Sequence, residues 1–322
     1  MKKRFFSALL ALTLILSLAA CSNKTSAPAS TAPEKNIESP DSGAAKRISI
    51  LTPYLSSVTT NEMVEAMKKG LEDNGMEVTV VDTKGDFGQL ASRIEDVVSS
   101  KPDAMILVSA DPNQVKTQLQ AAIDAGIPVF GCDSGYIDGM MVNATSDNYA
   151  MGEQIVRYLF EGLMKGKGTV IALTHRPHPG VVKRCEAFDT VLKEYPDIKL
   201  ITEQHVEVPG PIENSRKIME NLILSNPNKD SITAVWCAWD EPAIGATQAL
   251  QDAGRDEVIV TGVDGNSQAV EMIYQGSNLK ATLAQNFEGM AEIVVDDIVK
   301  LLSGQEIETG EKYAPATLIT KD

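Results

Sequence analysis

The sequence predicts an α/β protein made of two doubly wound parallel-sheet lobes, and three observations carry this prediction. From residue 46 onward, short apolar runs alternate with amphipathic stretches of about a dozen residues, the rhythm of strands and crossover helices. Most runs are apolar on both faces, as in parallel strands that helices cover on both sides. The alternation restarts near residue 150, and residues 47–322 are too many for one ordinary core.

In the first half of the chain, apolar runs and helical stretches follow one another in this order. Met63, Met67 and Leu71 recur every four residues on one helical face, and Gly75 ends that stretch. Gly126 ends a later helix in the same way. The expected strands are 47–51, 76–81, 104–108 and 127–130, and the expected helices are 60–74, 87–100 and 112–125.

The second half repeats the βαβ order without a shorter fixed repeat. The expected helices are 150–164, 181–194, 213–224, 242–253, 268–274 and 290–302. The expected strands are 169–173, 199–206, 234–238 and 258–263, with a short apolar run at 281–284. Because ligands of such sheets bind beyond the carboxyl ends of the strands, the residues after each strand are the candidates for a binding site.

Residues 1–21 have the pattern of an export signal. Three basic residues at positions 2–4 precede a short apolar segment, which Leu18-Ala19-Ala20-Cys21 closes. This last sequence resembles the bacterial lipoprotein box, in which the Cys is acylated and becomes the new N-terminus. We therefore expect a protein that is extracytoplasmic and lipid-anchored to the cell membrane through Cys21. An ordinary cleaved signal with an incidental Cys21 is the alternative.

Composition after the signal indicates a tether and a neutral ligand. Residues 22–46 are rich in Ser, Ala, Pro and Thr, which predicts a flexible linker. The formal net charge is −15, from 29 Lys and Arg against 44 Asp and Glu, and loss of the three basic residues of the signal lowers it to −18. A field of this sign repels nucleic acid and anionic ligands, so we expect no nucleic-acid partner.

Three cysteines follow Cys21, namely Cys132, Cys185 and Cys237. An odd number at wide spacing predicts neither a disulfide framework nor a zinc ribbon. Cys132 and Cys237 end apolar runs, as small buried side chains in strands do. Because the chain has only three His, we expect no metal site, and we expect no cofactor.

Polar and aromatic side chains gather after the expected strands of the sequence. They include Asp133, His178, Arg184, Trp239, Asp264 and Gln285. Carboxylates accept hydroxyl hydrogens, Arg donates to adjacent oxygens, and Trp offers an apolar face to the C–H side of a sugar ring. A helix N-cap is the alternative role for each Asp; we favour it for Asp240, and we favour ligand binding for Asp133 and Asp264.

Five short sequences carry a family resemblance. They are Met67-Lys68-Lys69-Gly70, Ala125-Gly126-Ile127-Pro128-Val129, Ser146-Asp147-Asn148, Ala243-Ile244-Gly245-Ala246 and Val263-Asp264-Gly265. Together they resemble the type I periplasmic binding proteins, typified by the ribose and galactose/glucose receptors. The resemblance implies a hinge of three crossovers, near 146–148, 285–287 and 314–318. It implies an N-terminal lobe of residues 47–147 and 286–314 and a C-terminal lobe of residues 148–285 and 315–322.

The resemblance also implies roles for individual residues. Those matched to ligand-binding positions are Asn61 and Asp133 in the N-terminal lobe and His178, Arg184, Asp264 and Gln285 in the C-terminal lobe. His178 and Arg184 repeat the His-Pro-x4-Arg spacing of the galactose/glucose type. Arg184 is expected to donate to ring hydroxyls, and Asp133 is expected to accept from them.

Three departures from the family pattern bear on the ligand. Ser134 stands where the ribose type has a second Arg, and Trp239 stands where both types have an Asn. Residues 62–64 replace an aromatic pair that usually follows the matched Asn. We keep Ser134 and Trp239 as ligand residues, with Trp239 as a stacking wall and Tyr54 and Tyr136 as further aromatic candidates. The departures indicate an altered ligand, such as a linear polyol or a deoxy sugar.

The resemblance implies a solute-binding lipoprotein that captures a sugar or polyol and delivers it to the permease and ATPase subunits of an ABC-type importer. A membrane sensor kinase or chemotaxis receptor is the alternative partner, and a nucleoside or signalling furanose is the alternative ligand. An enzyme would need Asp133 with Asp264, or Cys185 with His178, but neither pair lies in a catalytic motif. A regulator of the lactose-repressor family would carry a helix-turn-helix where this chain has its export signal.

Overall fold

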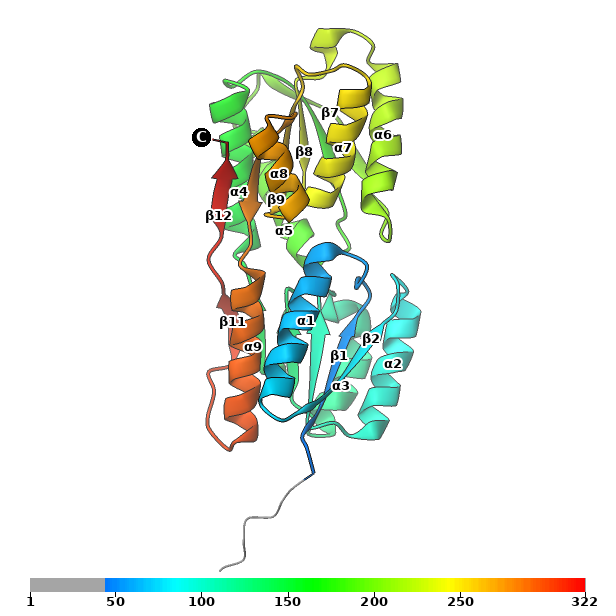
Figure 1. Cartoon of the computed structure of the whole chain (residues 1–322), viewed down its shortest axis with the longest axis vertical. Helices are drawn as coiled ribbons and strands as arrows, with labels where there is room; N and C mark the ends of the chain where they lie inside the picture. The colour runs from blue at the N-terminus through cyan, green and yellow to red at the C-terminus, as the bar shows by residue number, and fades with distance from the viewer. Residues whose placement is uncertain (1–43, 322) are drawn as a thin grey trace, which may run out of the picture. The chain divides into compact units, whose positions relative to one another are not determined.

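The computed structural model describes residues 44–321, so the expected signal, Cys21 and almost all of the expected linker lie outside the described residues. In the described part, two six-stranded sheets each carry helices on both faces (Figure 1), which confirms the predicted α/β fold. None of the helices in residues 44–321 combines the length and apolar character that a membrane crossing requires.

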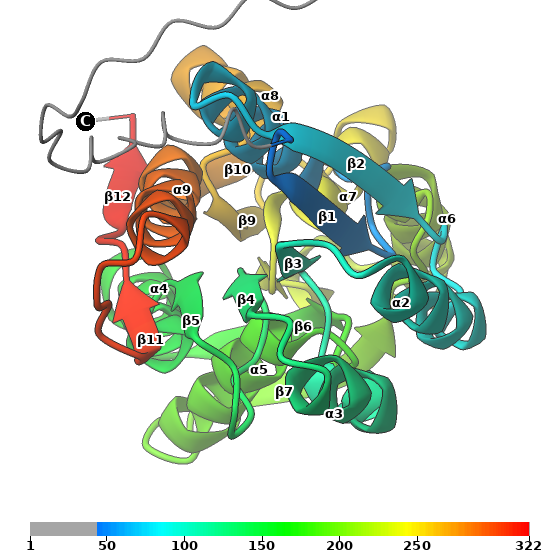
Figure 2. The same ribbon diagram turned by 90° about the horizontal axis from the view of Figure 1, so that it is seen from below.

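The first sheet is parallel throughout and is covered on both faces. Its strands, in spatial order, are β11 (Gly310–Tyr313), β5 (Val142–Thr145), β4 (Val129–Cys132), β3 (Ala104–Val108), β1 (Arg47–Thr52) and β2 (Glu77–Asp82). One face carries α1 (Val58–Asp73) and α9 (Phe287–Leu302), and the other carries α2 (Phe87–Ser100) and α3 (Lys116–Asp124), which follows a 3₁₀ turn at Pro112–Val115 (Figure 2). Alternate residues of β3 pack against opposite pairs of helices, which explains why the whole strand is apolar.

The second sheet has the same order of crossovers with one antiparallel edge strand. Its strands, in spatial order, are β12 (Thr317–Thr320), β10 (Leu279–Ala284), β9 (Ile259–Asp264), β8 (Ala234–Cys237), β6 (Gly168–Thr174) and β7 (Ile198–His205), and β12 runs antiparallel to β10. The helices of this lobe are α4 (Asn148–Arg157), α5 (Pro179–Leu192), α6 (Pro211–Ser225), α7 (Asp240–Asp252) and α8 (Ser267–Gln275). A π-helical turn at Tyr158–Leu163 extends α4, and a 3₁₀ turn at Lys229–Ser231 precedes β8.

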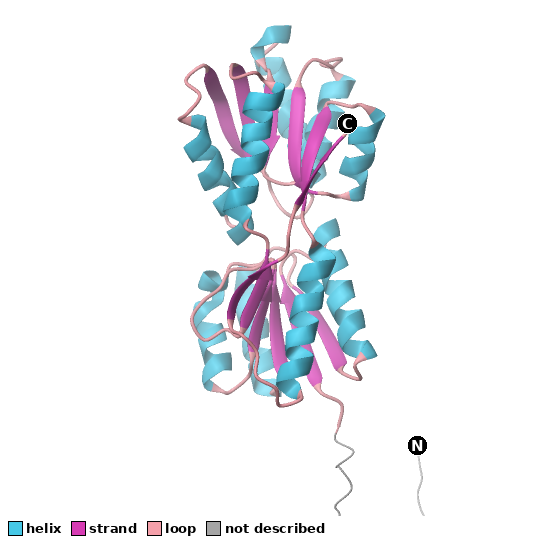
Figure 3. Cartoon of the chain, turned by 90° about the vertical axis from the view of Figure 1, so that its left-hand side faces the viewer, coloured by secondary structure: helices cyan, strands magenta, loops and turns pink. Residues whose placement is uncertain are grey.

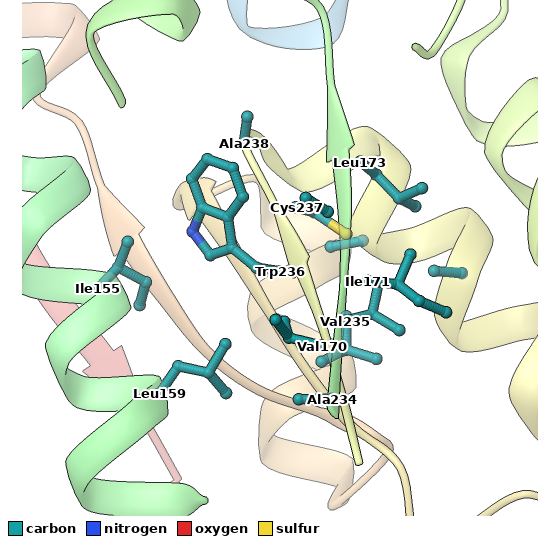
Figure 4. Close-up of a cluster of buried hydrophobic side chains, with 14 of the residues drawn as sticks. Ile155, Leu159, Val170, Ile171, Leu173, Ala234, Val235, Trp236, Cys237 and Ala238 are labelled. Atoms are coloured by element: carbon teal, nitrogen blue, oxygen red, sulfur yellow. The ribbon is translucent and has the colours of Figure 1, made fainter. Parts of the chain in front are cut away.

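Trp236 anchors the core of the second lobe. Its ring stacks on Phe188 of α5 with centroids 4.6 Å apart. Figure 4 shows Trp236 pointing toward the side of the sheet that carries Ile155 of α4 and Leu159 of the π-helical turn, while the next residue, Cys237, points the other way. A buried aromatic ring next to the β8 end therefore gives the adjoining loop a rigid base.

Within residues 44–321 the chain passes from one sheet to the other three times. The crossings lie between β5 and α4, between β10 and α9, and between β11 and β12 (Figure 3). At the first crossing α4 packs on α5 of the second lobe, and at the second crossing α9 returns to pack on α1 of the first. The carboxyl ends of the parallel strands of both sheets face the space between these crossings (Figure 1).

Candidate ligand-binding site

A cavity of about 470 Å³, measured out to its solvent opening, lies between the strand ends of the two sheets. Six of the eight residues expected to bind ligand line it, namely Asp133, His178, Arg184, Trp239, Asp264 and Gln285. Tyr54, one of the two further aromatic candidates, also lines it, and the other lining residues are Ser57, Thr59, Thr60, His175, Val181, Val208 and Glu241.

The structure does not bring Asn61 or Ser134 to this cavity. Asn61 is exposed on α1, one residue beyond Thr60, which does line the cavity. Ser134 follows Asp133, whose left-handed backbone (φ 47°) turns the chain, and its hydroxyl donates to the carbonyl oxygen of Ala110. Ser134 instead lines a neighbouring hollow with Tyr136, so Tyr136 is no part of the main cavity.

Asp133 presents an unpaired acceptor. Its Oδ2 lies 3.5 Å from Ser109 Oγ and 3.6 Å from His178 Nε2, whereas its buried Oδ1 has no hydrogen-bond partner. Burial raises the pKa of Asp133 to about 7, an effect that the nearby Arg184 opposes and Asp264 reinforces. Leaving a buried acceptor unpaired is costly, so a ligand hydroxyl that donates to Oδ1 is favoured there.

Arg184, Asp264 and Gln285 form a bonded group on the other sheet. Arg184 of α5 is 2% exposed; its Nε donates to Asn148 Oδ1 at 2.8 Å and its Nη1 to the Ala238 carbonyl oxygen at 2.8 Å. Nη1 also lies 3.5 Å from Asp264 Oδ1, which accepts from Gln285 Nε2 at 2.9 Å. Gln285 Oε1 is buried without a partner, so the group offers a second free acceptor.

Burial and neighbouring groups act in opposite directions on the pKa of Asp264. Burial raises the pKa of its carboxyl group to about 6, while the Arg184 guanidinium and the Gln285 amide act against that rise. The backbone of Asp264 has φ 129°, a conformation that L-residues rarely adopt. Strain of this kind is tolerated where the surroundings fix a side chain, here at the carboxyl end of β9.

His178 is a neutral hydrogen-bond donor. It is the N-cap of α5, and its Nδ1 accepts from the N–H groups of Gly180 at 3.1 Å and Val181 at 3.4 Å. Because Nδ1 uses its lone pair, the ring proton is on Nε2 and faces Asp133. Burial, with a contribution from Arg184, lowers the pKa of His178 to about 3, so the contact with Asp133 is no ion pair between full charges.

His175 and Tyr54 join the two sheets at another part of the cavity. His175 Nδ1 lies 3.0 Å from the Val206 carbonyl oxygen, which only accepts, so Nδ1 carries the proton and Nε2 is free to accept. The Tyr54 hydroxyl, 3.2 Å away, donates to that Nε2. Burial lowers the pKa of His175 and raises that of Tyr54 to about 12, so both groups keep these states near neutral pH.

Trp239 and Ser57 both donate to one carboxylate oxygen. Trp239 Nε1 lies 3.2 Å from Glu241 Oε2, and Ser57 Oγ of the first lobe lies 3.0 Å from the same atom. The Trp239 ring meets His175 edge-on, with centroids 6.1 Å apart. The indole thus contributes an apolar surface to the cavity, because its only polar atom is already bonded.

Asp240 supports the site from beneath, and the N-cap role expected for it is wrong. Trp239 holds the N-cap position of α7, and Asp240 lies in the first turn, fully buried. Its Oδ2 accepts from the Asn266 N–H at 2.8 Å and its Oδ1 from Thr282 Oγ1 at 2.8 Å. A Cβ on Gly262 would lie 2.2 Å from Oδ1, so this bond network requires glycine there. Asp240 therefore ties the ends of β9 and β10 to α7 and fixes the turn after Asp264.

The cysteines and potential metal ligands form no second site in the described part of the chain. Cys132, Cys185 and Cys237 are buried and unpaired, and burial raises the pKa of each thiol, to about 12 for Cys185. They pack as small apolar side chains, and the Cys132 thiol lies 3.8 Å from Met63 Sδ. Among residues 44–321, no three His, Cys, Asp or Glu side chains are placed to hold a metal ion.

Tyr54 and His175 obey the rule that found the others. Tyr54 lies two residues after β1 and His175 directly after β6, so both follow strands whose carboxyl ends meet at the cavity. Tyr54 was a candidate on its aromatic character, and the position of His175 after a strand is the signal that points to it. Glu241 follows the strand that ends before Trp239, although it lies inside the first turn of α7.

Comparison with known proteins gives consistent matches along the chain. A family model described as a periplasmic binding protein domain matches residues 48–306. The chain is 31% identical over 240 residues to the D-apiose import binding protein of Actinobacillus succinogenes, covering 74% of this chain and 76% of that protein. It is 28% identical over 313 residues to the ribose import binding protein of Bacillus subtilis, covering 95% of each. A solved solute-binding protein of an ABC transporter from Agrobacterium vitis, with bound allitol, superposes with a TM-score of 0.80 at 29% identity, covering 86% of this chain and 96% of that one.

Proposed function

This chain belongs to the periplasmic binding protein family, and from that premise we propose that it captures a sugar or polyol between its two lobes for an ABC-type importer. The observation that carries the proposal is the cavity lined by Asp133, Gln285 and Arg184, because Asp133 Oδ1 and Gln285 Oε1 are buried acceptors without partners. A molecule with several hydroxyl groups satisfies all three. Relatives named for ribose, D-apiose and allitol support the same ligand class. The role is binding and release, without a chemical step.

Closure of the lobes is the second part of the proposal. The lobes, residues 47–147 with 286–314 and residues 148–285 with 315–322, turn as bodies about the three crossings. Tyr54 bonds to His175 and Ser57 bonds to Glu241 across the cavity, and a ligand that contacts Asp133 and Asp264 adds contacts from both lobes. Contacts that exist only in the closed form shift the population toward it. The closed form is then the one that the importer recognises.

A thermal-shift screen of the chain without residues 1–21 tests the ligand class. The panel contains D-ribose, D-apiose, xylitol, allitol and D-allose, with adenosine and inosine for the alternative ligand class. A ligand at a hundredfold excess over its Kd stabilises the folded state by about 2.7 kcal/mol, which gives a clear rise in Tm. A rise with a sugar or polyol is expected, and it should disappear in Asp133→Ala. A panel without any shift, or a shift with nucleosides alone, contradicts the proposal.

Lipid anchoring through Cys21 completes the proposed role, because an anchored receptor stays near a membrane importer. The signal pattern at residues 1–21 supports it. We expect the full-length chain, expressed in a bacterial host, to fractionate with membranes and to take up radiolabelled palmitate. The Cys21→Ser variant should do neither, whereas Cys185→Ser should behave as the wild type in both assays. Equal labelling of wild type and Cys21→Ser would show that the anchor is absent.

A further inference from the structure

The strand orders of the two sheets divide the cavity into two ends. In each sheet, the strands next to the crossings lie at one edge. These strands are β11 and β5 in the first sheet and β12 and β10 in the second. Gln285 and Asp133 follow β10 and β4, and Asp264 is the last residue of β9; these three strands lie toward that side. Tyr54 and His175 follow β1 and β6, which lie toward the outer side. The cavity therefore has a crossing end and an outer end with different side chains.

At the outer end the polar side chains are bonded to one another; Ser57 donates to Glu241, and Thr60 donates to Ser109. We call this end the outer wall and define it as Tyr54, His175, Val208 and Trp239. The Tyr54 hydroxyl donates to His175 Nε2, His175 Nδ1 donates to the Val206 carbonyl oxygen, and Trp239 Nε1 donates to Glu241. Val208 contributes only methyl groups. Every polar side-chain group of the wall therefore already has a hydrogen-bond partner, and no side-chain donor is left over for a ligand hydroxyl group.

The crossing end is the opposite. Asp133 Oδ1 and Gln285 Oε1 are buried there without partners, and Asp264 and Arg184 complete the polar surface. Hydroxyl groups of a ligand gain bonds at this end. A hydroxyl group against the outer wall loses its bonds to water and meets only groups that are already bonded, so its desolvation is poorly compensated.

We propose that the ligand is a polyhydroxylated molecule with one end that lacks a hydroxyl group, such as a terminal deoxy sugar or deoxy polyol. Its hydroxylated part binds at the crossing end, and its methyl or other apolar end lies against the outer wall. This inference rests on the proposed function and narrows its ligand class. The outer wall then determines the selectivity between a sugar and its deoxy analogue.

Matched ligand pairs measured by isothermal titration test the inference on the chain without residues 1–21. The pairs are D-ribose with 5-deoxy-D-ribose, L-galactose with L-fucose, and xylitol with its 1-deoxy analogue. In at least one pair, the deoxy member should bind about tenfold more tightly or better, because it leaves no hydroxyl group unpaired at the wall. A site built to bond that hydroxyl group would reject the deoxy member instead. Equal or weaker binding of all the deoxy members overturns the inference but leaves the proposed function standing. No binding by any member of any pair overturns both.

A wall variant shows whether the outer wall makes the choice. Val208→Thr adds one hydroxyl group to the wall at nearly constant size. The preference for the deoxy ligand over its hydroxylated parent, given by the ratio of their Kd values, should therefore fall about tenfold or more. Val208→Ser repeats the test at the same position if Val208→Thr does not fold. Val299→Thr on α9 is the matched control, because Val299 does not line the cavity, and its ratio should equal that of the wild type. Unchanged ratios in both folded wall variants overturn the role of the wall.

Discussion

Replacing Arg184 with Ala is expected to raise the Kd for the sugar or polyol about a thousandfold. Arg184 is the only cationic side chain that lines the cavity within residues 44–321, and it is 2% exposed. Removing it takes away a charged donor to the ligand and leaves Asp264 buried without its cationic neighbour. Truncating one partner of a buried charge pair costs about 2–5 kcal/mol, which corresponds to factors between about 30 and several thousand. Isothermal titration measures the change directly.

Two further variants separate binding from folding in this test. Arg184→Lys keeps the charge but not the planar fork that reaches Asn148, Ala238 and the cavity together, so it too should lose most of the affinity. Lys183→Ala is the control; its side chain is half exposed and pairs with Glu311 at 3.8 Å outside the cavity. Circular dichroism verifies that each variant is folded. A folded Arg184→Ala protein that binds within tenfold of the wild type would contradict the assignment.

The sequence pattern located the buried elements well, because burial on both faces leaves a strong local signal. The expected strand 104–108 and helix 87–100 coincide with β3 and α2. The strands missed were β5, β11 and β12, each short and two of them at a sheet edge. β11 has the sequence Gly-Glu-Lys-Tyr and pairs on one side only, so no apolar run marks it. Helix starts were expected two residues late at α6 and α7, where Pro and acidic residues form the first turn.

Position after a strand and the family spacing predicted part of the site. Asp264 and Gln285 come directly at or after a strand end, and their meeting follows from adjacent strands β9 and β10. The bonds between the lobes were not predictable, because nothing local to Tyr54 indicates His175, 121 residues away. The direction of Ser134 depended on one backbone angle, φ 47° at Asp133, which the residue type does not encode. Pairings of this kind depend on the completed fold.

The second large effect concerns the pH dependence of stability through Asp133. The pKa of this carboxyl group is about 7 in the folded protein against an ordinary 3.8, so the folded state holds the proton more tightly than the unfolded chain does. A raised acid pKa means that stability is lost as the pH rises from about 4 to about 7. At 1.36 kcal/mol per pKa unit, this loss is about 4 kcal/mol. Asp133→Asn removes the titration and should therefore gain about that much over the wild type between pH 4 and pH 8.

The comparison must be made as a difference between the two proteins, because other groups titrate in the same range. The folded pKa of His178 is lowered to about 3, so its contribution to stability rises with pH up to about 6.5 in both proteins, and in the wild type it opposes the contribution of Asp133. Urea unfolding gives the free energy of unfolding of the wild type and of Asp133→Asn at matched pH values. The contributions of His178 and Asp264 largely cancel in the difference between the two. A ligand hydroxyl group that donates to Asp133 favours the ionised carboxylate, so saturating sugar should shrink the difference, and affinity should rise from pH 5 to pH 8. The contradicting result would be stability profiles of the wild type and Asp133→Asn that run parallel from pH 4 to pH 8. Asp133 would then be ionised in the free protein throughout this range, with no proton for the ligand to displace.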